Sequence, residues 1–219
     1  MQKFPKDIYT EPQPDSDTLA NLGPLRALAG IWQGQLGMDV NPKAQGAEHQ
    51  AFIEQIELQP IDGQTNGPQL YYGLRYHTRI FKPDDNQTFH DQVGYWLWEP
   101  ASGSIIQTLT IPRGQTAMAV GQTHAQAREF RLEAVRGSLT NGISSNPFLE
   151  HAFRTERYVI AVQTHADGSW SYRQETTLII PGQAEPFAHT DHNHLYKIAE
   201  PSLNPTAYAA QQVATEIGG

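Results

Sequence analysis

The chain has 219 residues, a formal net charge of −8 and no cysteine. Its 15 Lys and Arg residues are scattered without a basic run, which argues against nucleic acid and against an anionic membrane surface as partners. The lack of cysteine excludes disulfides, thiolate catalysis and Cys-ligated metals. The first residues lack the apolar core of a signal peptide, and no run approaches the ~18 apolar residues of a membrane span, so we expect a cytoplasmic protein.

The chain opens with a polar segment that is followed by one short apolar run. Residues 1–18 carry three prolines among acidic and polar side chains, which predicts an irregular arm. Residues 18–28 hold Leu19, Leu22, Leu25 and Leu28 and are followed by Ala-Gly, which predicts a short helix or helical turn. Such an element, placed before the first strand, would cover one end of a barrel.

From residue 30 to about residue 198 the sequence reads as a series of β-strands. Turn-forming Pro, Gly, Asn and Asp residues separate the apolar segments, and no helical period lies between them. The connection Ala166-Asp167-Gly168 gives the strongest hairpin signal. The predicted strands are residues 30–39, 49–58, 69–81, 88–98, 104–111, 116–123, 129–135, 153–165, 169–180 and 186–198.

These segments, about ten in number, predict one all-β domain over residues 19–200. Short turns between consecutive strands indicate an antiparallel up-and-down meander, which either closes into a barrel or packs as a sandwich. The longest irregular piece is residues 136–153. Residues 201–219 are rich in Pro and then in Ala and Gln, and they predict a C-terminal tail with a helical turn from Pro205 and a loose end.

The densest group of chemically versatile side chains lies in the last predicted strand, which reads His-Thr-Asp-His-Asn-His from residue 189. Alternation places His189 and Asp191 on one face and His192 and His194 on the other. An Asp two residues from a His on one face can orient an imidazole that ligates a metal or haem iron, or that takes up a proton. A solvated polar face is the alternative, and strand parity does not say which face lies inside.

Two further groups contain candidate ligand-binding residues. In the strand over residues 88–98, His90, Gln92 and Trp96 share a face, which suits either a ligand pocket with an apolar wall and polar anchors or a core with a satisfied His. Arg113 follows a strand-ending proline, and Glu175 lies in a largely apolar strand. These two residues predict an internal ion pair or an anchor for a substrate carboxylate, with ordinary surface charges as the alternative.

Several motifs together resemble the nitrobindin or haem-binding β-barrel family, whose fatty-acid-binding-protein-like barrels are related to the C-terminal domain of a human THAP protein. A Trp between two glycines suits the first strand of such a barrel, where its ring plugs one end. The resemblance covers about residues 22–198. The motifs are Leu25-x-x-Leu28-x-Gly30-x-Trp32-x-Gly34, Asp39-x-x-Pro42, Gly94-Tyr95-Trp96, Glu175-Thr176-Thr177 and the His-bearing last strand.

The resemblance implies a ten-stranded antiparallel barrel. In haem-binding members one His of the last strand holds ferric haem b, and such members bind nitric oxide and isomerise peroxynitrite to nitrate. The ligand His of those members is directly followed by Leu, a pattern that His194 matches through Leu195. Position in the strand and the same-face partner Asp191 point instead to His189, which we take as the expected haem or metal ligand.

The leading hypothesis is therefore a nitrobindin-like barrel that binds a small hydrophobic ligand in its interior, with haem b as the candidate cofactor. One alternative is a carrier of a non-haem lipid or aromatic molecule. The other is a cofactor-free enzyme that uses acid–base chemistry through His189, Glu175 and Arg113. A homodimer is an open alternative to a monomer. The candidate residues are His189, Asp191 and His194 for the cofactor, and Trp32, His90, Trp96, Arg113 and Glu175 for the ligand.

Overall fold

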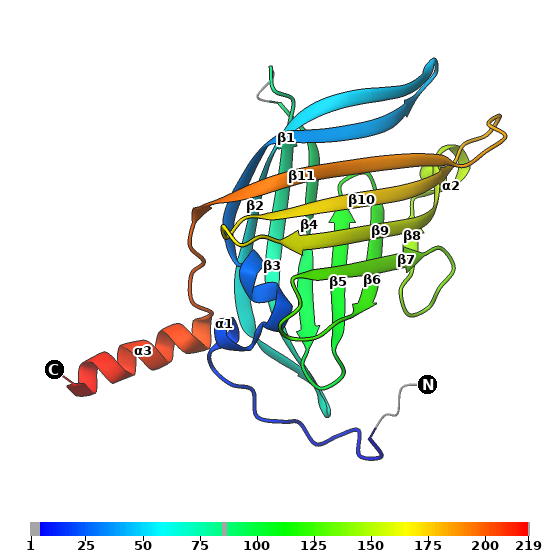
Figure 1. The fold of residues 1–219 in the computed structure, drawn as a ribbon. Coiled ribbons are helices and arrows are strands. Elements are labelled where there is room, and N and C mark those ends of the chain that lie inside the picture. The colour runs from blue at the N-terminus through cyan, green and yellow to red at the C-terminus, as the bar shows by residue number, and fades with distance from the viewer. Residues whose placement is uncertain (1–4, 85–86, 219) are drawn as a thin grey trace.

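The computed structural model describes residues 5–84 and 87–218. In this part of the chain, ten antiparallel strands form a closed barrel, and a short helical segment precedes the first strand (Figure 1). The strands are β1 (Gly30–Lys43), β2 (Gly46–Asn66), β3 (Gln69–Phe81), β4 (Thr88–Glu99), β5 (Ser104–Ile111), β6 (Gln115–Gln122), β7 (Glu129–Val135), the accessory β8 (Ile143–Ser145), β9 (Arg154–Thr164), β10 (Trp170–Ile179) and β11 (Phe187–Ala199). The helices are α1 (Thr18–Asn21), a 3-10 helix (Gly23–Leu28), α2 (Pro147–Ala152) and α3 (Pro205–Gly218).

The topology is an up-and-down meander. Each barrel strand pairs with the next one along the chain, β7 pairs with β9 because β8 lies beside β6, and β1 pairs with β11 to join the first strand to the last. The prediction of about ten antiparallel strands is confirmed. The pairing of β1 with β11 decides between the two expected architectures, since it closes the sheet on itself.

The first hairpin is longer than the sequence predicts. The pair Asn41-Pro42 suggests an end to the first strand, yet β1 continues through Pro42 to Lys43, and Pro42 lies opposite Ala47 of β2. The pairing of β11 with β1 stops at Val40, so Pro42 lies on a sheet edge and its missing N–H leaves no partner strand unsatisfied. Figure 1 shows this hairpin, in blue and cyan, extending past the neighbouring strands.

Apolar packing closes the end of the barrel next to the 3-10 helix. Leu22, Leu25, Leu28 and Trp32 are fully buried there. The Trp32 Nε1–H donates to the Leu28 carbonyl oxygen at 2.8 Å, and the Trp32 ring meets Trp170 edge-on with 6.1 Å between ring centroids. The indole therefore fixes the helical segment to the first strand and plugs this end of the barrel, as the sequence predicts for Trp32.

Residues 136–153, expected to be irregular, contain a strand and a helix. β8 pairs with Gln115–Ala117 of β6, and α2 follows it directly. The side-chain oxygen of Asn146 accepts hydrogen bonds from the Phe148 and Leu149 amides, and Pro147 occupies the first turn. Asn at the N-cap and Pro at the next position are a helix-start signal, so the sequence did carry the information for α2.

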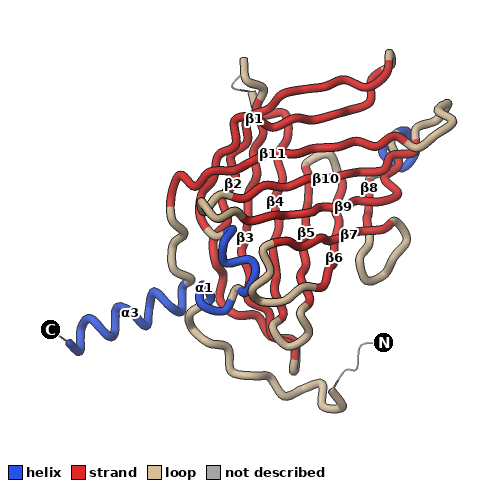
Figure 2. The backbone as a smooth tube through the Cα atoms, in the orientation of Figure 1, coloured by secondary structure: helices blue, strands red, loops and turns tan. Residues whose placement is uncertain are grey.

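The C-terminal helix α3 extends away from the barrel (Figures 1 and 2) and is longer than the expected helical turn. Its described side chains are exposed apart from the half-buried Ala207. In the described part of the chain, none of the helices combines the length and the apolar character that a membrane-crossing helix needs.

Candidate functional site

The barrel interior contains a cavity of about 600 Å³ that is lined by residues of every barrel strand except β7. Its floor, next to the plugged end, is apolar and includes Ile56, Trp96, Ile160 and Trp170. The cavity opens at the opposite end of the barrel. Exposed charged side chains lie around this mouth, namely Lys43, Glu48, Lys82 and Arg113.

A belt of hydrogen-bonded polar side chains lies between the floor and the mouth. The Tyr158 hydroxyl lies 2.9 Å from Gln107 Oε1 and 3.0 Å from Gln174 Oε1, and Gln174 Nε2 donates to Asp191 Oδ2 at 3.0 Å. On another part of the wall, Gln92 Nε2 donates to the Tyr76 hydroxyl at 2.7 Å. The cavity wall therefore offers hydrogen-bonding groups as well as apolar surface.

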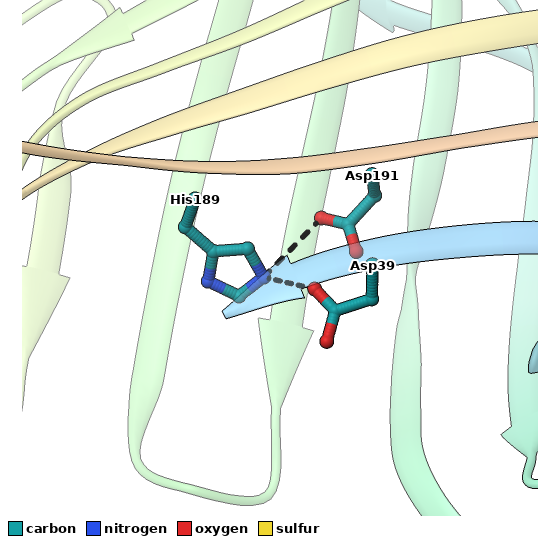
Figure 3. A group of neighbouring side chains, drawn as sticks. All are labelled: Asp39, His189 and Asp191. Carbon is teal, nitrogen blue, oxygen red and sulfur yellow. Dashed lines mark ion pairs between the residues drawn. The ribbon is translucent and has the colours of Figure 1, made fainter. Parts of the chain in front are cut away.

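Three side chains from two neighbouring strands meet on the wall near the mouth. His189 Nε2 lies 2.8 Å from Asp39 Oδ1 and 3.5 Å from Asp191 Oδ2. Asp39 belongs to β1 and lies directly opposite Asp191 of β11, so the register of these two strands assembles the group. Figure 3 shows the three side chains pointing toward one another.

The charges in this group stabilise one another. Burial lowers the pKa of His189, but its contacts with Asp191 and Asp39 outweigh burial and raise that pKa from 6.5 to about 10. Burial raises the pKa of Asp39, but His189 and the amide of Asn41 more than compensate, so the net shift is downward. At neutral pH His189 is therefore an imidazolium beside the ionised Asp39.

The second histidine of the cavity wall, His90, has a lowered pKa, in contrast to His189. His90 lies on β4 and is half-buried, and burial lowers its pKa, with the nearby positive charge of Arg113 acting in the same direction. Its imidazole is therefore neutral at pH 7. Arg113 Nη2 donates to the Phe89 carbonyl oxygen at 2.7 Å, which holds the guanidinium beside the mouth.

A buried acid, Glu54, completes the polar wall and was not among the predicted site residues. Its Oε2 accepts from the Tyr172 hydroxyl at 2.9 Å and from Asn193 Nδ2 at 3.0 Å. Burial raises the pKa of Glu54 to about 7, against the effect of these two donors. The signal was present in the sequence, because alternation places Glu54 on the same face as the apolar Phe52 and Ile56.

The structure brings together five of the predicted site residues and separates three others from them. His189, Asp191, His90, Trp96 and Arg113 all line the cavity.

His194 lies on the outer face of β11, as strand alternation requires once His189 points inward. Its Nε2 lies 2.7 Å from Ser169 Oγ, and its ring stacks between His165 and Tyr196 with centroid distances of 4.8 Å to each. The sequence interpretation that gave His194 a cofactor-binding position is corrected here, since its imidazole does not reach the cavity.

Glu175 and Trp32 also lie away from the cavity wall. Glu175 is on the outer face of β10, on the side of Arg157, whereas its neighbours Gln174 and Thr176 line the cavity. The expected internal pair of Glu175 with Arg113 is therefore wrong, because the two residues lie on opposite sides of the barrel wall. Trp32 is buried beneath the cavity floor and acts in packing.

Comparison with known proteins identifies the family of this chain and a solved structure with a similar fold. The family described as THAP4-like, heme-binding beta-barrel domain matches residues 21–197. Among solved structures, the crystal structure of Rv2717c from M. tuberculosis is similar in fold, with a TM-score of 0.54 at 21% sequence identity over 82% of this chain and 96% of that chain. A comparison with curated proteins found no match. Because the family match spans most of the sequence and the barrel is the expected one, the chain belongs to the THAP4-like, haem-binding β-barrel domains.

Proposed function

We propose that the barrel binds a small organic molecule in its interior, with the apolar part of the ligand against the floor and its polar group toward the belt around Tyr158. The observation that carries this proposal is the cavity of about 600 Å³. Small-molecule sites in proteins typically enclose about 300–1,000 Å³ and combine apolar walls with a few polar groups, as this cavity does. Arg113, which a hydrogen bond to the Phe89 carbonyl oxygen holds beside the mouth, is one of the cations that a ligand carboxylate would meet.

Haem is the ligand that the family's description names, and a histidine that would hold its iron needs an imidazole nitrogen with a free lone pair. His189 does not fit this role as it stands. Its Nε2 lies against Asp39 and Asp191, and its raised pKa of about 10 keeps the ring protonated at neutral pH. The proton on this ring would have to leave before a nitrogen could bind iron. The two carboxylate oxygens beside Nε2 favour that proton and occupy the space that a porphyrin ring would need there.

A second candidate function is haem binding through His90. Its lowered pKa leaves a neutral imidazole on the cavity wall, and the family description supports haem as a ligand. Nitric oxide binding and peroxynitrite isomerisation, which the resemblance to haem-binding members implies, belong to this candidate. Bound haem would supply the iron chemistry, while the protein would supply the imidazole of His90 and the surrounding polar wall.

The cofactor-free enzyme hypothesis loses its basis. General acid–base catalysis needs its groups within hydrogen-bond reach of one another. His189 and Arg113 line the cavity, but Glu175 lies on the outer face, so these three side chains do not form one site.

Displacement of a fluorescent fatty acid tests the binding of an organic ligand. Ala117 faces the cavity, so Ala117→Trp is expected to occupy part of it and to weaken probe binding at least tenfold, which is about 1.4 kcal/mol. Met118→Trp adds the same ring on the outer face of the same strand and is expected to leave binding unchanged. Equal binding by wild type and Ala117→Trp would place the probe outside the cavity and overturn the proposal.

An absorption titration with ferric haem tests the second candidate. A Soret band that forms in wild type and in His189→Ala but not in His90→Ala would support ligation by His90. His194→Ala, on the outer face, serves as the matched control and is expected to behave as wild type. Ligation by His90 is refuted if His90→Ala keeps the wild-type band or if wild type gives none.

A further inference from the structure

We propose that Asp39, His189 and Asp191 form a binding site for one divalent first-row transition-metal cation, without porphyrin. Each side chain offers one ligand atom, and the three atoms lie within 4.8 Å of one another. This site goes beyond organic-ligand binding in the cavity and does not depend on it.

Two of the three distances between the donor atoms are close to those of ligands that share one cation. With metal–ligand bonds of about 2.1 Å, neighbouring ligand atoms lie about 3.0 Å apart in octahedral and about 3.4 Å apart in tetrahedral coordination. His189 Nε2 lies 2.8 Å from Asp39 Oδ1 and 3.5 Å from Asp191 Oδ2. A cation beside His189 Nε2 would therefore lie within reach of both carboxylates, which Figure 3 shows on the same side of the imidazole.

The way in which Asp39 Oδ1 meets the His189 ring is a second, independent observation. Asp39 is 8% exposed, and its Oδ1 makes no directed hydrogen bond to any described residue, although His189 Nε2 is only 2.8 Å away. In a simple salt bridge the carboxylate oxygen lies close to the axis of the N–H bond. In a metal site a cation occupies that axis and the other ligands lie to its side, an arrangement with which the lack of a directed hydrogen bond to Oδ1 agrees.

The two carboxylates are held in place by amide side chains. Asn41 Nδ2 donates to Asp39 Oδ2 at 2.8 Å, and Gln174 Nε2 donates to Asp191 Oδ2 at 3.0 Å. Gln174 in turn interacts with the Tyr158 hydroxyl at 3.0 Å. Outer hydrogen bonds of this kind orient metal ligands and preserve their geometry.

The donor set and the surroundings indicate the class of cation. One imidazole with two carboxylates suits Mn²⁺, Fe²⁺ or Zn²⁺, whereas Ca²⁺ requires six to eight oxygen ligands. All three side chains line the cavity, so positions that the protein does not fill would face the cavity and accept water or a ligand group. A cation would bind by replacing the proton on His189 Nε2, which passes to solvent.

Mn²⁺ binding to the metal-free, haem-free full chain tests the site. Binding is followed through the loss of the electron paramagnetic resonance signal of free Mn²⁺ and is expected to saturate at one ion per chain. Asp39→Asn and Asp191→Asn are each expected to weaken binding at least tenfold. A nitrogen coupling to bound Mn²⁺ is expected in wild type and is expected to disappear in His189→Gln, and Zn²⁺ is expected to displace Mn²⁺.

The outer face provides a matched control. His77 Nε2 lies 2.9 Å from Asp91 Oδ2 in an exposed pair, and Asp91→Asn is expected to leave Mn²⁺ binding within twofold of wild type. Melting curves recorded in the presence of a chelator identify any variant that fails to fold. If a variant does not fold, the nitrogen coupling in wild type still shows whether a histidine binds the Mn²⁺ ion. Absence of saturable binding, absence of the nitrogen coupling, or equal losses in Asp91→Asn and Asp39→Asn would overturn the proposal. Ala117→Trp is expected to bind Mn²⁺ normally, which separates this result from organic-ligand binding.

Discussion

Glu54 is a carboxyl group that the barrel encloses completely. Its pKa is raised from 4.5 to about 7, so between these pH values the native state keeps a proton that the unfolded chain has released. Stability therefore falls as the pH rises through this window and stays lower above it. Gln has no charge and retains an oxygen that accepts from Tyr172 and Asn193. We expect Glu54→Gln to be more stable than wild type at pH 8 by roughly 1–3 kcal/mol.

Urea denaturation of wild type and Glu54→Gln at pH 4.5 and pH 8 measures this effect. The difference in the free energy of unfolding is expected to be small at the lower pH and to grow toward the higher one. A difference that is the same at both pH values would mean that the ionisation of Glu54 is not its cause.

His189 is expected to make the stability depend on pH in a higher range. Its pKa is raised from 6.5 to about 10, so the contribution of its ion pairs is complete below about pH 6.5 and is lost as the pH rises through about 10. The stability difference between wild type and His189→Gln should therefore shrink between pH 6 and pH 10. His77→Gln, which removes the exposed pair with Asp91, should give only a small difference, because solvent screens that pair. Denaturation curves recorded from pH 6 to pH 10 measure these stability differences. A difference between wild type and His189→Gln that stays constant over this range would contradict a raised pKa of His189.

Strand alternation predicted part of this site from the sequence. It placed His189 with Asp191 and His90 with Trp96, and it separated His194 from His189. It did not show which face of the last strand is inside, because both faces carry histidines. It also did not connect Asp39 to this group, because that contact depends on the pairing of β1 with β11 and on the register irregularities within it.

Among the secondary-structure elements, α3 is attached to the barrel mainly through the residue that precedes it. Asn204 is 1% exposed, its Nδ2 donates to Ser16 O at 2.8 Å and to Asp62 Oδ1 at 2.7 Å, and its Oδ1 accepts from the Thr18 amide at 3.2 Å. Asn204→Ala removes three hydrogen bonds, including the one that the amide of the buried Thr18 donates, and is expected to cost roughly 1–3 kcal/mol. Deletion of residues 208–219 is expected to leave the free energy of unfolding nearly unchanged, since the described side chains from 208 onward are exposed.

Thermal and urea unfolding of the Asn204→Ala chain and of the chain truncated after Ala207 check this contrast. A large loss of stability on truncation would show that α3 packs on the barrel more than its exposure indicates. The helix itself was underestimated from the sequence, because an Ala- and Gln-rich segment has high helix propensity but no apolar stripe that would fix its length.

For the molecule as a whole, the sequence predicted the number and order of the strands better than it predicted that the sheet closes into a barrel. Consecutive strands separated by short turns pair with each other in a barrel and in a sandwich alike, so local patterns do not distinguish the two. The distinguishing contact, from Ile31–Ala199 to Val40–Thr190, joins segments at opposite ends of the domain. No periodicity within either segment contains that information.

The closed barrel is not equally strong around its circumference. In the described chain, β6 and β7 share one registered pair, Val120 with Glu133, whereas β1 and β2 pair from Gly30–Leu58 to Lys43–Gly46. Figure 1 shows that the strand direction changes sharply between β6 and β7, which accounts for the short contact. Because few ladder hydrogen bonds hold this seam, its opening should require less free energy than the opening of other seams.

Native-state hydrogen exchange measures that opening strand by strand. Amides that face the seam on β7, and on the part of β6 that β8 does not cover, are expected to exchange faster than amides between β1 and β2. They are also expected to exchange faster than amides that face β5 or β9 on the same two strands. Successive amides of an antiparallel strand point to its two neighbours in turn, so amides on the two edges of one strand can be compared directly. This comparison removes differences in solvent exposure between strands. If the ligand fills the cavity and contacts both walls, adding it should slow exchange at the seam more than elsewhere. Uniform protection around the barrel would show that side chains stabilise the seam as well as a hydrogen-bonded ladder does.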